Sequence, residues 1–256
     1  MQRALPALTL LALLVAWEAL VRLARIPHYT LPAPSLVLHT LVANFGSLAA
    51  SWWFTLKITF GALLFACAGG VLIAAVFALW RPVERALFPI AVVLQVTPIV
   101  AVAPLILIYV ESTTAALLLC AWIVAFFPIL SNTVIGLRAA DPQLRDLFRL
   151  YRATPLQRLR WLLVPSALPY FVAGLKISGG LSLIGAVTAE MVAGAAGRET
   201  GLASRILEAS FRTETPKMFA ALMLLVLTGV LIFWSFNLVS RTLLGRWHAV
   251  ESSRPD

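Results

Sequence analysis

Charged side chains are scarce in this sequence: Asp, Glu, Lys and Arg make up 12% of its 256 residues, and hydrophobic residues make up 61%. Soluble domains carry about 25% charged residues, so this chain lacks the polar surface that a water-soluble domain of its size needs. Its mean hydropathy of +0.93 points the same way. The shortage of charge excludes an ordinary soluble domain and predicts a protein of the lipid bilayer.

Cysteine and clustered metal ligands are also rare. The two cysteines, Cys67 and Cys120, lie in apolar runs, where we expect small buried side chains rather than a disulfide or a metal pair. The three histidines, His28, His39 and His248, are scattered over loops and a terminus. The sequence contains neither a P-loop nor a His-Glu-x-x-His motif. It predicts no metal site, no cofactor and no catalytic residue, and therefore a protein that is not an enzyme.

Acidic residues are fewer than basic ones, 11 against 20, which gives a net charge of +9. The basic residues are spread between apolar segments and are not interleaved with aromatic side chains on a polar surface, the pattern that nucleic-acid binding requires. We therefore expect no nucleic-acid partner and attribute the positive charge to membrane topology.

Long apolar segments fill most of the chain and leave no room for a sizeable soluble domain. A spanning helix needs about 20 apolar residues. We expect an all-α transmembrane domain over residues 1–256 with about six spans, and the first is expected to remain as an anchor because no small-residue cleavage site follows it. Between the first two spans we expect an outer loop with a short helix at 35–48. The predicted spans are 5–22, 57–79, 86–110, 115–137, 162–190 and 218–240.

The distribution of basic residues predicts the orientation of the chain. Cytoplasmic loops of membrane proteins are the more basic ones. With the amino terminus inside, the cytoplasmic connections hold twice as many basic residues as the outer ones, which favours N-in and C-in. The cytoplasmic set is Arg3, Arg81, Arg85, Arg138, Arg145, Arg149, Arg152, Arg158, Arg160, Arg241, Arg246 and Arg254, and the outer set is Arg22, Arg25, Arg198, Arg205, Arg212 and Lys217.

The connection between the fourth and fifth spans predicts a folded hairpin over residues 141–165. Asp141 can cap a helix that begins at Pro142, and Thr154 with Pro155 repeats this signal for a second short helix that ends near Pro165. Apolar and basic side chains then occupy different faces of the first helix, which makes it amphipathic. The apolar set is Leu144, Leu147, Phe148 and Tyr151, and the basic set is Arg145, Arg149 and Arg152.

This pattern is compatible with three roles. The arginines can bind anionic lipid headgroups while the apolar face rests on the bilayer. Alternatively, the hairpin docks into a groove of a cytoplasmic protein, or it folds back to gate a pore. Amphipathicity alone does not choose between them.

The residues of the hairpin are similar to a known loop motif. Residues 146–154 read Asp-Leu-Phe-Arg-Leu-Tyr-Arg-Ala-Thr, and residues 164–169 read Val-Pro-Ser-Ala-Leu-Pro. They resemble the loop of ABC importer permeases, usually written Glu-Ala-Ala, three residues, Gly, and a Leu-Pro further on. The resemblance implies that the hairpin is the coupling helix, which inserts into the cleft of an ATPase subunit. The coupling residues it implies are Arg145, Asp146, Leu147, Phe148, Arg149, Arg152, Ala153 and Thr154.

Further local similarities agree with this family. Together they resemble the nitrate, sulfonate and taurine branch, over about Thr55 to Leu202. The resemblance implies a type I ABC importer (MetI-like) permease fold in the bacterial inner membrane. The similar segments are Thr97-Pro98 to Pro104-Leu105, Phe127-Pro128-Ile129 with Asn132 and Gly136, Gly174-Leu175-Lys176, and Gly185 to Glu190.

The resemblance also implies partners and a cargo. Permeases of this family work as two permeases on two ATPases, so we expect a homodimer, two ABC ATPase subunits that hydrolyse ATP, and a periplasmic substrate-binding protein. The implied cargo is a small polar solute, either a sulfonate-, nitrate- or taurine-like anion or a thiamine-precursor pyrimidine.

The motif is degenerate in this chain. Asp146 stands in place of its Glu, Leu147 and Phe148 replace its two alanines, and Arg152 occupies the position of its glycine. Glycine at that position permits a tight bend, so Arg152 predicts that the turn is made differently or is shifted to Thr154-Pro155. Residues 109–112, Tyr-Val-Glu-Ser, also replace the Trp-Phe-Gly-like turn that is usual after the third span.

We expect the translocation pathway along the third span, where prolines interrupt regular packing. Pro98 and Pro104 each remove a backbone donor in mid-membrane, so the span should be kinked. Gln95 and Thr97 are polar neighbours of these prolines and are assigned to the pathway with them.

The fifth span adds Lys176, Gly179 and Glu190 to the predicted pathway. Ionisable residues in membranes usually face a protein interior or an aqueous cavity. Lys176 and Glu190 lie about 21 Å apart along a helix and cannot pair within it. For Lys176 the alternative is extension to the cytoplasmic interface, and for Glu190 it is binding to a loop or to the receptor protein.

Two other classes of protein remain as alternatives. An ion-gradient-driven secondary transporter more often carries carboxylates deep in the membrane, and the runs 86–110, 115–137 and 218–240 have none. A non-transport scaffold or a membrane subunit of a redox complex is disfavoured by the organised hairpin and by the lack of ligand clusters.

Overall fold

The computed structural model describes residues 5–195, 197 and 201–251, and all regular structure in these ranges is helical. The chain forms two compact units. The first contains the described residues up to Thr55 together with Glu190–Thr228, and the second contains Leu56–Ala189 with the described residues from Gly229 onward. The prediction of one domain over 1–256 stays a prediction.

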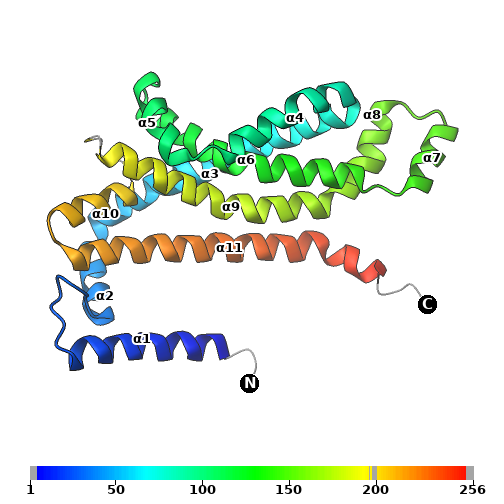
Figure 1. Ribbon diagram of the computed structural model, residues 1–256. Coiled ribbons are helices and arrows are strands. Elements are labelled where there is room, and N and C mark those ends of the chain that lie inside the picture. The colour runs from blue at the N-terminus through cyan, green and yellow to red at the C-terminus, as the bar shows by residue number, and fades with distance from the viewer. Residues whose placement is uncertain (1–4, 196, 198–200, 252–256) are drawn as a thin grey trace. The chain divides into compact units, whose positions relative to one another are not determined.

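The first unit contains α1 (Leu5–Leu23), α2 (Pro34–Ala43), α10 (Leu202–Phe211) and portions of three longer helices. Glu18 of α1 accepts hydrogen bonds from the backbone N–H and the hydroxyl of Ser35, at 3.0 and 2.7 Å, and pairs with Arg22 at 2.6 Å. These contacts attach α1 to the first turn of α2. Figure 1 shows the ribbons of the two helices beside each other.

The core of the second unit is α6 (Thr113–Arg138), with portions of α3 (Phe45–Leu79) and α9 (Val164–Ala195) packed against it and a portion of α11 (Thr215–Glu251) packed against α9 (Figure 1). Glycines allow these helices to approach closely. A Cβ on Gly174 of α9 would lie 2.8 Å from the Pro128 carbonyl oxygen of α6, and one on Gly70 of α3 would lie 2.8 Å from Ile129. Small residues at helix contacts are typical of membrane bundles.

Four helical segments are long and apolar enough to span a membrane: Phe45–Leu79, Thr113–Arg138, Pro155–Ala195 and Thr215–Leu243. A fifth candidate is the bent pair α4 (Arg81–Val96) and α5 (Ile99–Tyr109). Helix α1 coincides with the predicted span 5–22 and carries no charged residue before Glu18. The predicted all-α membrane fold is confirmed.

The kink predicted in the span 86–110 is a sharp bend between two separate helices. Helices α4 and α5 meet at an angle of 100° at Thr97 and Pro98. The Thr97 backbone is extended, because Pro98 disfavours the helical conformation of the residue before it. Pro104, in contrast, lies within α5. The expected break is confirmed at Pro98 and is much sharper than a kink.

Two other predicted boundaries need correction. The short helix expected at 35–48 ends at Ala43, and α3 begins at Phe45, far ahead of the predicted start at 57. The second helix of the hairpin does not end near Pro165. It runs from α8 (Pro155–Arg158) through the π-helical turn η1 (Leu159–Leu163) directly into α9. The wider π turn relieves the clash that a proline ring makes with the preceding turn.

Candidate functional site

The two caps predicted for the hairpin are confirmed. The Asp141 carboxylate accepts the backbone N–H of Gln143 at 2.7 Å and begins α7 (Pro142–Leu150). Thr154 begins α8 with a complete capping box, in which its hydroxyl accepts from Gln157 N and the Gln157 side chain accepts from Thr154 N. Each helix has proline in its first turn, where a missing N–H costs no hydrogen bond. The local sequence therefore specifies both helix starts.

Arg152 takes the backbone conformation that the motif's glycine would favour. Its φ is +52°, in the left-handed region. Its N–H binds the Arg149 carbonyl and the Ala153 N–H binds the Phe148 carbonyl, both at 2.9 Å, which is the hydrogen-bond pattern of a Schellman cap. The expectation that the turn is made differently or shifted is therefore wrong: the turn stays in place, with an arginine in the strained conformation.

Most apolar side chains of the hairpin have no covering in the described chain. Leu147 is 44% exposed and Tyr151 80% exposed, whereas Phe148 is half-buried and packs against the core. Trp161 lies beside them, and a cavity of 390 Å³ runs along this side. It is lined by Leu147, Phe148, Tyr151, Ala153, Gln157 and Trp161. The exposed side chains define an apolar surface on the hairpin.

Arg145 fixes α7 to the end of α6. Its guanidinium donates to the carbonyl oxygens of Leu137 and Arg138, which belong to the last turn of α6. These carbonyls have no partner within their own helix, and the negative end of the helix dipole favours a cation there. Asp146 and Arg149 form instead an exposed ion pair at 3.2 Å, a type that contributes little to stability.

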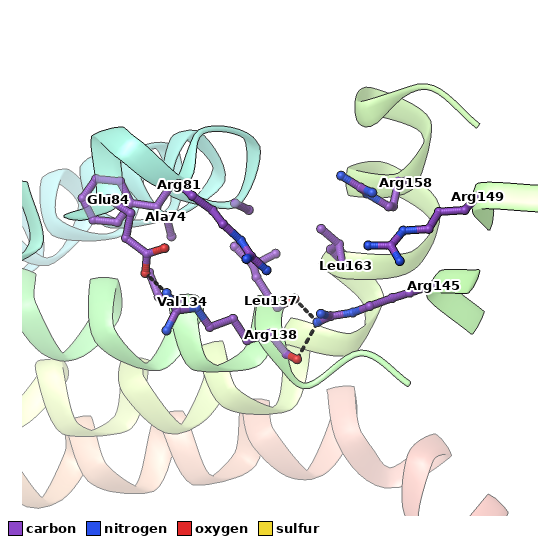
Figure 2. A pocket seen from close by; sticks show the side chains of 12 residues that line it. Ala74, Arg81, Glu84, Val134, Leu137, Arg138, Arg145, Arg149, Arg158 and Leu163 are labelled. Carbon is purple, nitrogen blue, oxygen red and sulfur yellow. Dashed lines mark hydrogen bonds and ion pairs between the residues drawn. The ribbon is translucent and has the colours of Figure 1, made fainter. Parts of the chain in front are cut away.

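A second cavity, the basic cavity, has a volume of 270 Å³ and lies between α7, α8, the start of α4 and the ends of α3 and α6. Figure 2 shows guanidinium groups pointing toward it from different elements. Glu84, which is 8% exposed, pairs with Arg138 at its edge. The lining is Ala74, Phe77, Ala78, Arg81, Glu84, Val134, Leu137, Arg138, Arg145, Arg149, Arg158 and Leu163.

Sequence reasoning missed this convergence. It assigned Arg81, Arg138 and Arg158 to topology alone, and it gave Glu84 no role. These residues are separated by long stretches of sequence and belong to no common motif. Only the packing of four helix ends brings them together, so no local signal could have identified them.

The predicted pathway residues of the third span surround the break between α4 and α5. Gln95, Pro98 and Pro104 are exposed, and Thr97 is half-buried. The Thr97 hydroxyl donates to the Val93 carbonyl at 2.7 Å, within its own chain segment. None of these four residues lines either of the two cavities described above.

Two of the pathway residues of the fifth span contact α11. Lys176 Nζ lies 3.3 Å from Asn237 Oδ1, and Gly179 is buried where a Cβ would lie 2.4 Å from the Phe236 ring. Gly179 thus serves close packing of α9 on α11 in the second unit.

The third, Glu190, belongs to the first unit and is fully buried. Its Oε2 accepts the Ala203 N–H and the Thr55 hydroxyl, both at 3.1 Å, and Thr55 Oγ1 accepts the Leu202 N–H at 2.9 Å. Residues from α9 and α3 therefore cap the first turn of α10, whose own N-cap, Gly201, has no side chain to do so. This geometry agrees with the alternative in which Glu190 binds a loop of its own chain rather than lining the pathway.

Apolar spans and a sharply bent helix pair define a multi-pass helical membrane protein with a capped amphipathic hairpin at its surface. Residues 66–245 match the family model of the binding-protein-dependent transport system inner membrane component. The chain belongs to this family, which contains ABC importer permeases.

Curated relatives support the membership over nearly the whole chain. The riboflavin transport system permease protein RibX of Chloroflexus aurantiacus is 35% identical, covering 94% of this chain and 89% of that protein. The formylaminopyrimidine transport permease protein ThiX of Halalkalibacterium halodurans is 32% identical, covering 93% and 94%. The putative aliphatic sulfonates transport permease protein SsuC of Bacillus subtilis is 28% identical, covering 94% and 86%. The predicted branch of ABC permeases is confirmed.

The fold also matches a solved structure. A chain of the MetNI methionine ABC transporter in inward-facing conformations superposes with a TM-score of 0.65 at 22% identity, covering 78% of this chain and 97% of that one. The predicted type I importer (MetI-like) permease fold is therefore confirmed.

Proposed function

We propose that this chain is the transmembrane subunit of an ATP-driven importer, and that residues 141–165 couple it to a separate ATPase subunit. The observation that carries the proposal is the apolar surface of the hairpin, where Leu147, Tyr151 and Trp161 are exposed. Because Arg145 ties α7 to the last turn of α6, displacement of the hairpin by a docked ATPase would be transmitted to a spanning helix. Family membership supports this role over an ion-gradient transporter or a passive scaffold.

The remaining parts of the mechanism follow the family. We propose a permease homodimer in the bacterial inner membrane, N-in and C-in, with two ATPase subunits and a periplasmic binding protein. The carboxylate-poor spans and the sharp break at Thr97-Pro98 support a pathway beside α4 and α5. Gln95, Thr97, Pro98, Pro104 and Lys176 remain our candidates for it.

The cargo that we propose is a small polar solute. Two relatives named for riboflavin and for formylaminopyrimidine are more similar to this chain than the one named for aliphatic sulfonates, over the same share of its length. This ranking favours a nitrogen-containing aromatic ring over a sulfonate. Mass spectrometry of the small molecules that co-purify with the partner binding protein tests the choice.

The coupling role is tested by purifying the chain from native membranes in mild detergent, identifying its partners and measuring ATP hydrolysis. We expect a P-loop ATPase that is lost from the variants Leu147→Asp and Tyr151→Asp but retained by Phe211→Asp, a control on an exposed position at the end of α10, outside the spanning helices. Replacement of Asp146 or Arg149 should weaken ATPase association more than expression. A chain that purifies alone and transports only with a proton or sodium gradient would overturn the proposal.

A further inference from the structure

The basic cavity concentrates positive charge without matching negative charge. Five arginines line it, and Glu84 is the single carboxylate in its lining. Glu84 is already paired with Arg138, and Arg149 has an exposed partner in Asp146. Within the described part of the chain, Arg81 and Arg158 have no ion-pair partner. Like charges gathered in one partly enclosed space repel each other more strongly than they would in water, so an anion in the cavity would be stabilised.

The arginines reach the cavity from separate elements, and their side chains differ in how many partners they already bind. Arg81 comes from the first turn of α4 and Arg158 from α8, and Figure 2 shows their guanidinium groups on different sides of the space. Arg145 is held by the α6 carbonyls, yet its Nε is buried and has no hydrogen-bond partner. A buried donor without a partner is uncommon and costs free energy. One arginine of the cavity lining thus carries a buried donor without an acceptor in the described part of the chain.

We propose that the basic cavity binds the phosphate group of an anionic phospholipid. A guanidinium group donates two parallel hydrogen bonds to two oxygens of one phosphate group. A single chloride ion cannot accept hydrogen bonds in this bidentate geometry. The volume of 270 Å³ lies just below the range of about 300–1,000 Å³ for small-molecule sites, so it suits a headgroup rather than a large ligand.

The location favours a membrane lipid over a free anion. The lining includes the last turns of two spanning helices, which end at Leu79 and Arg138, where headgroups meet helix ends. Its remaining wall is apolar and consists of side chains from the spans themselves: Ala74, Phe77, Ala78, Val134, Leu137 and Leu163. Basic pockets between helices at the cytoplasmic boundary are a known means of lipid-headgroup recognition. The inference does not depend on the coupling role of the hairpin.

The test compares two double variants with the same loss of charge, each taking one arginine from α4 and one from the continuous segment formed by α8 and η1. Arg81→Gln with Arg158→Gln removes two cavity arginines, while Arg85→Gln with Arg160→Gln removes two exposed neighbours that do not line the cavity. Native mass spectrometry of the purified transporter, titrated with phosphatidylglycerol or phosphatidylcholine, measures the bound lipid. We expect selective retention of phosphatidylglycerol, weakened about tenfold in the cavity variant and less than twofold in the control.

The measurements distinguish a phospholipid from a free phosphate ion as the source of the bound phosphate group. If inorganic phosphate at millimolar concentration displaces the bound phosphatidylglycerol from the wild type, and binds the lipid-free protein equally well, the ligand is a free anion and the lipid proposal is overturned. Equal weakening in both double variants, or equal retention of the two lipids, would show general surface electrostatics and would also overturn it. Loss of the ATPase from the cavity variant, with lipid binding unchanged, would assign the arginines to the protein partner instead.

Discussion

The Glu190 carboxylate and the Thr55 hydroxyl lie 3.1 Å apart and together accept the first two backbone N–H groups of α10, those of Leu202 and Ala203. One residue comes from α9 and the other from α3, so a helix without a cap of its own is capped by its neighbours. Gly201 is required at this point, because a Cβ there would lie 2.2 Å from Thr55 Oγ1 and 2.3 Å from Glu190 Oε1.

Replacement of Glu190 by alanine should destabilise the protein by about 1–3 kcal/mol, because the Ala203 N–H and the Thr55 hydroxyl lose a buried acceptor. Thermal unfolding of the detergent-purified chain measures the loss. Glu208→Ala, on the exposed side of α10, is the control and should cost less. An unchanged unfolding temperature for Glu190→Ala together with lost transport would assign Glu190 to the pathway instead.

Replacement of Gly174 by alanine should destabilise the contact of α9 with α6 by about 1–3 kcal/mol, since the added methyl group would meet the Pro128 carbonyl at 2.8 Å. Gly180→Ala on the same helix is the matched control. Nothing lies within 4 Å of its added Cβ, and alanine favours the helix by about 1 kcal/mol. The two variants should shift the unfolding temperature in opposite directions, and equal shifts would contradict the close packing described above.

Arg152→Gly should stabilise the hairpin by about 0.5–1 kcal/mol, because glycine adopts φ of +52° without the strain of a side chain. Hydrogen exchange of α7 measures the effect. Ala153→Gly is the control, because Ala153 does not have a positive φ and glycine there only adds flexibility to the unfolded chain. Slower exchange in Arg152→Gly and faster exchange in Ala153→Gly are expected, and faster exchange in both would argue against the Schellman cap.

Acid should weaken α10 through Glu208. Its hydrogen bond with Arg205 holds the pKa of this carboxylate below the ordinary value of 4.5. Because the folded-state pKa is the lower one, the stabilisation is complete above pH 4.5 and is lost as the pH falls through the folded-state pKa. The effect is small, since the side chain is 32% exposed. Glu208→Gln should flatten the pH dependence of unfolding below pH 4.5, and an unchanged profile would refute the assignment.

Much of the hairpin at residues 141–165 was predictable because its signals are local. Each helix start depends on residues within one helical turn, namely Asp141 or Thr154 and the proline that follows it. In the structure both helices begin where these residues predict. The resemblance of residues 146–154 to a family motif identified the same segment. Prediction failed at Arg152, because a Schellman cap can impose a left-handed conformation on a residue that disfavours it.

The sequence by itself determined the membrane class, the helical fold, the family and the caps of the hairpin, since each depends on composition or on residues a few positions apart. Tertiary structure decided which residues meet. It placed Glu190 at the start of α10, buried Gly179 against Phe236, and brought Arg81, Arg145 and Arg158 to one cavity. The physical reason is that such contacts depend on how helices cross and where they bend, as at Thr97-Pro98, and no pattern within a single helix encodes the side chains that its neighbours present.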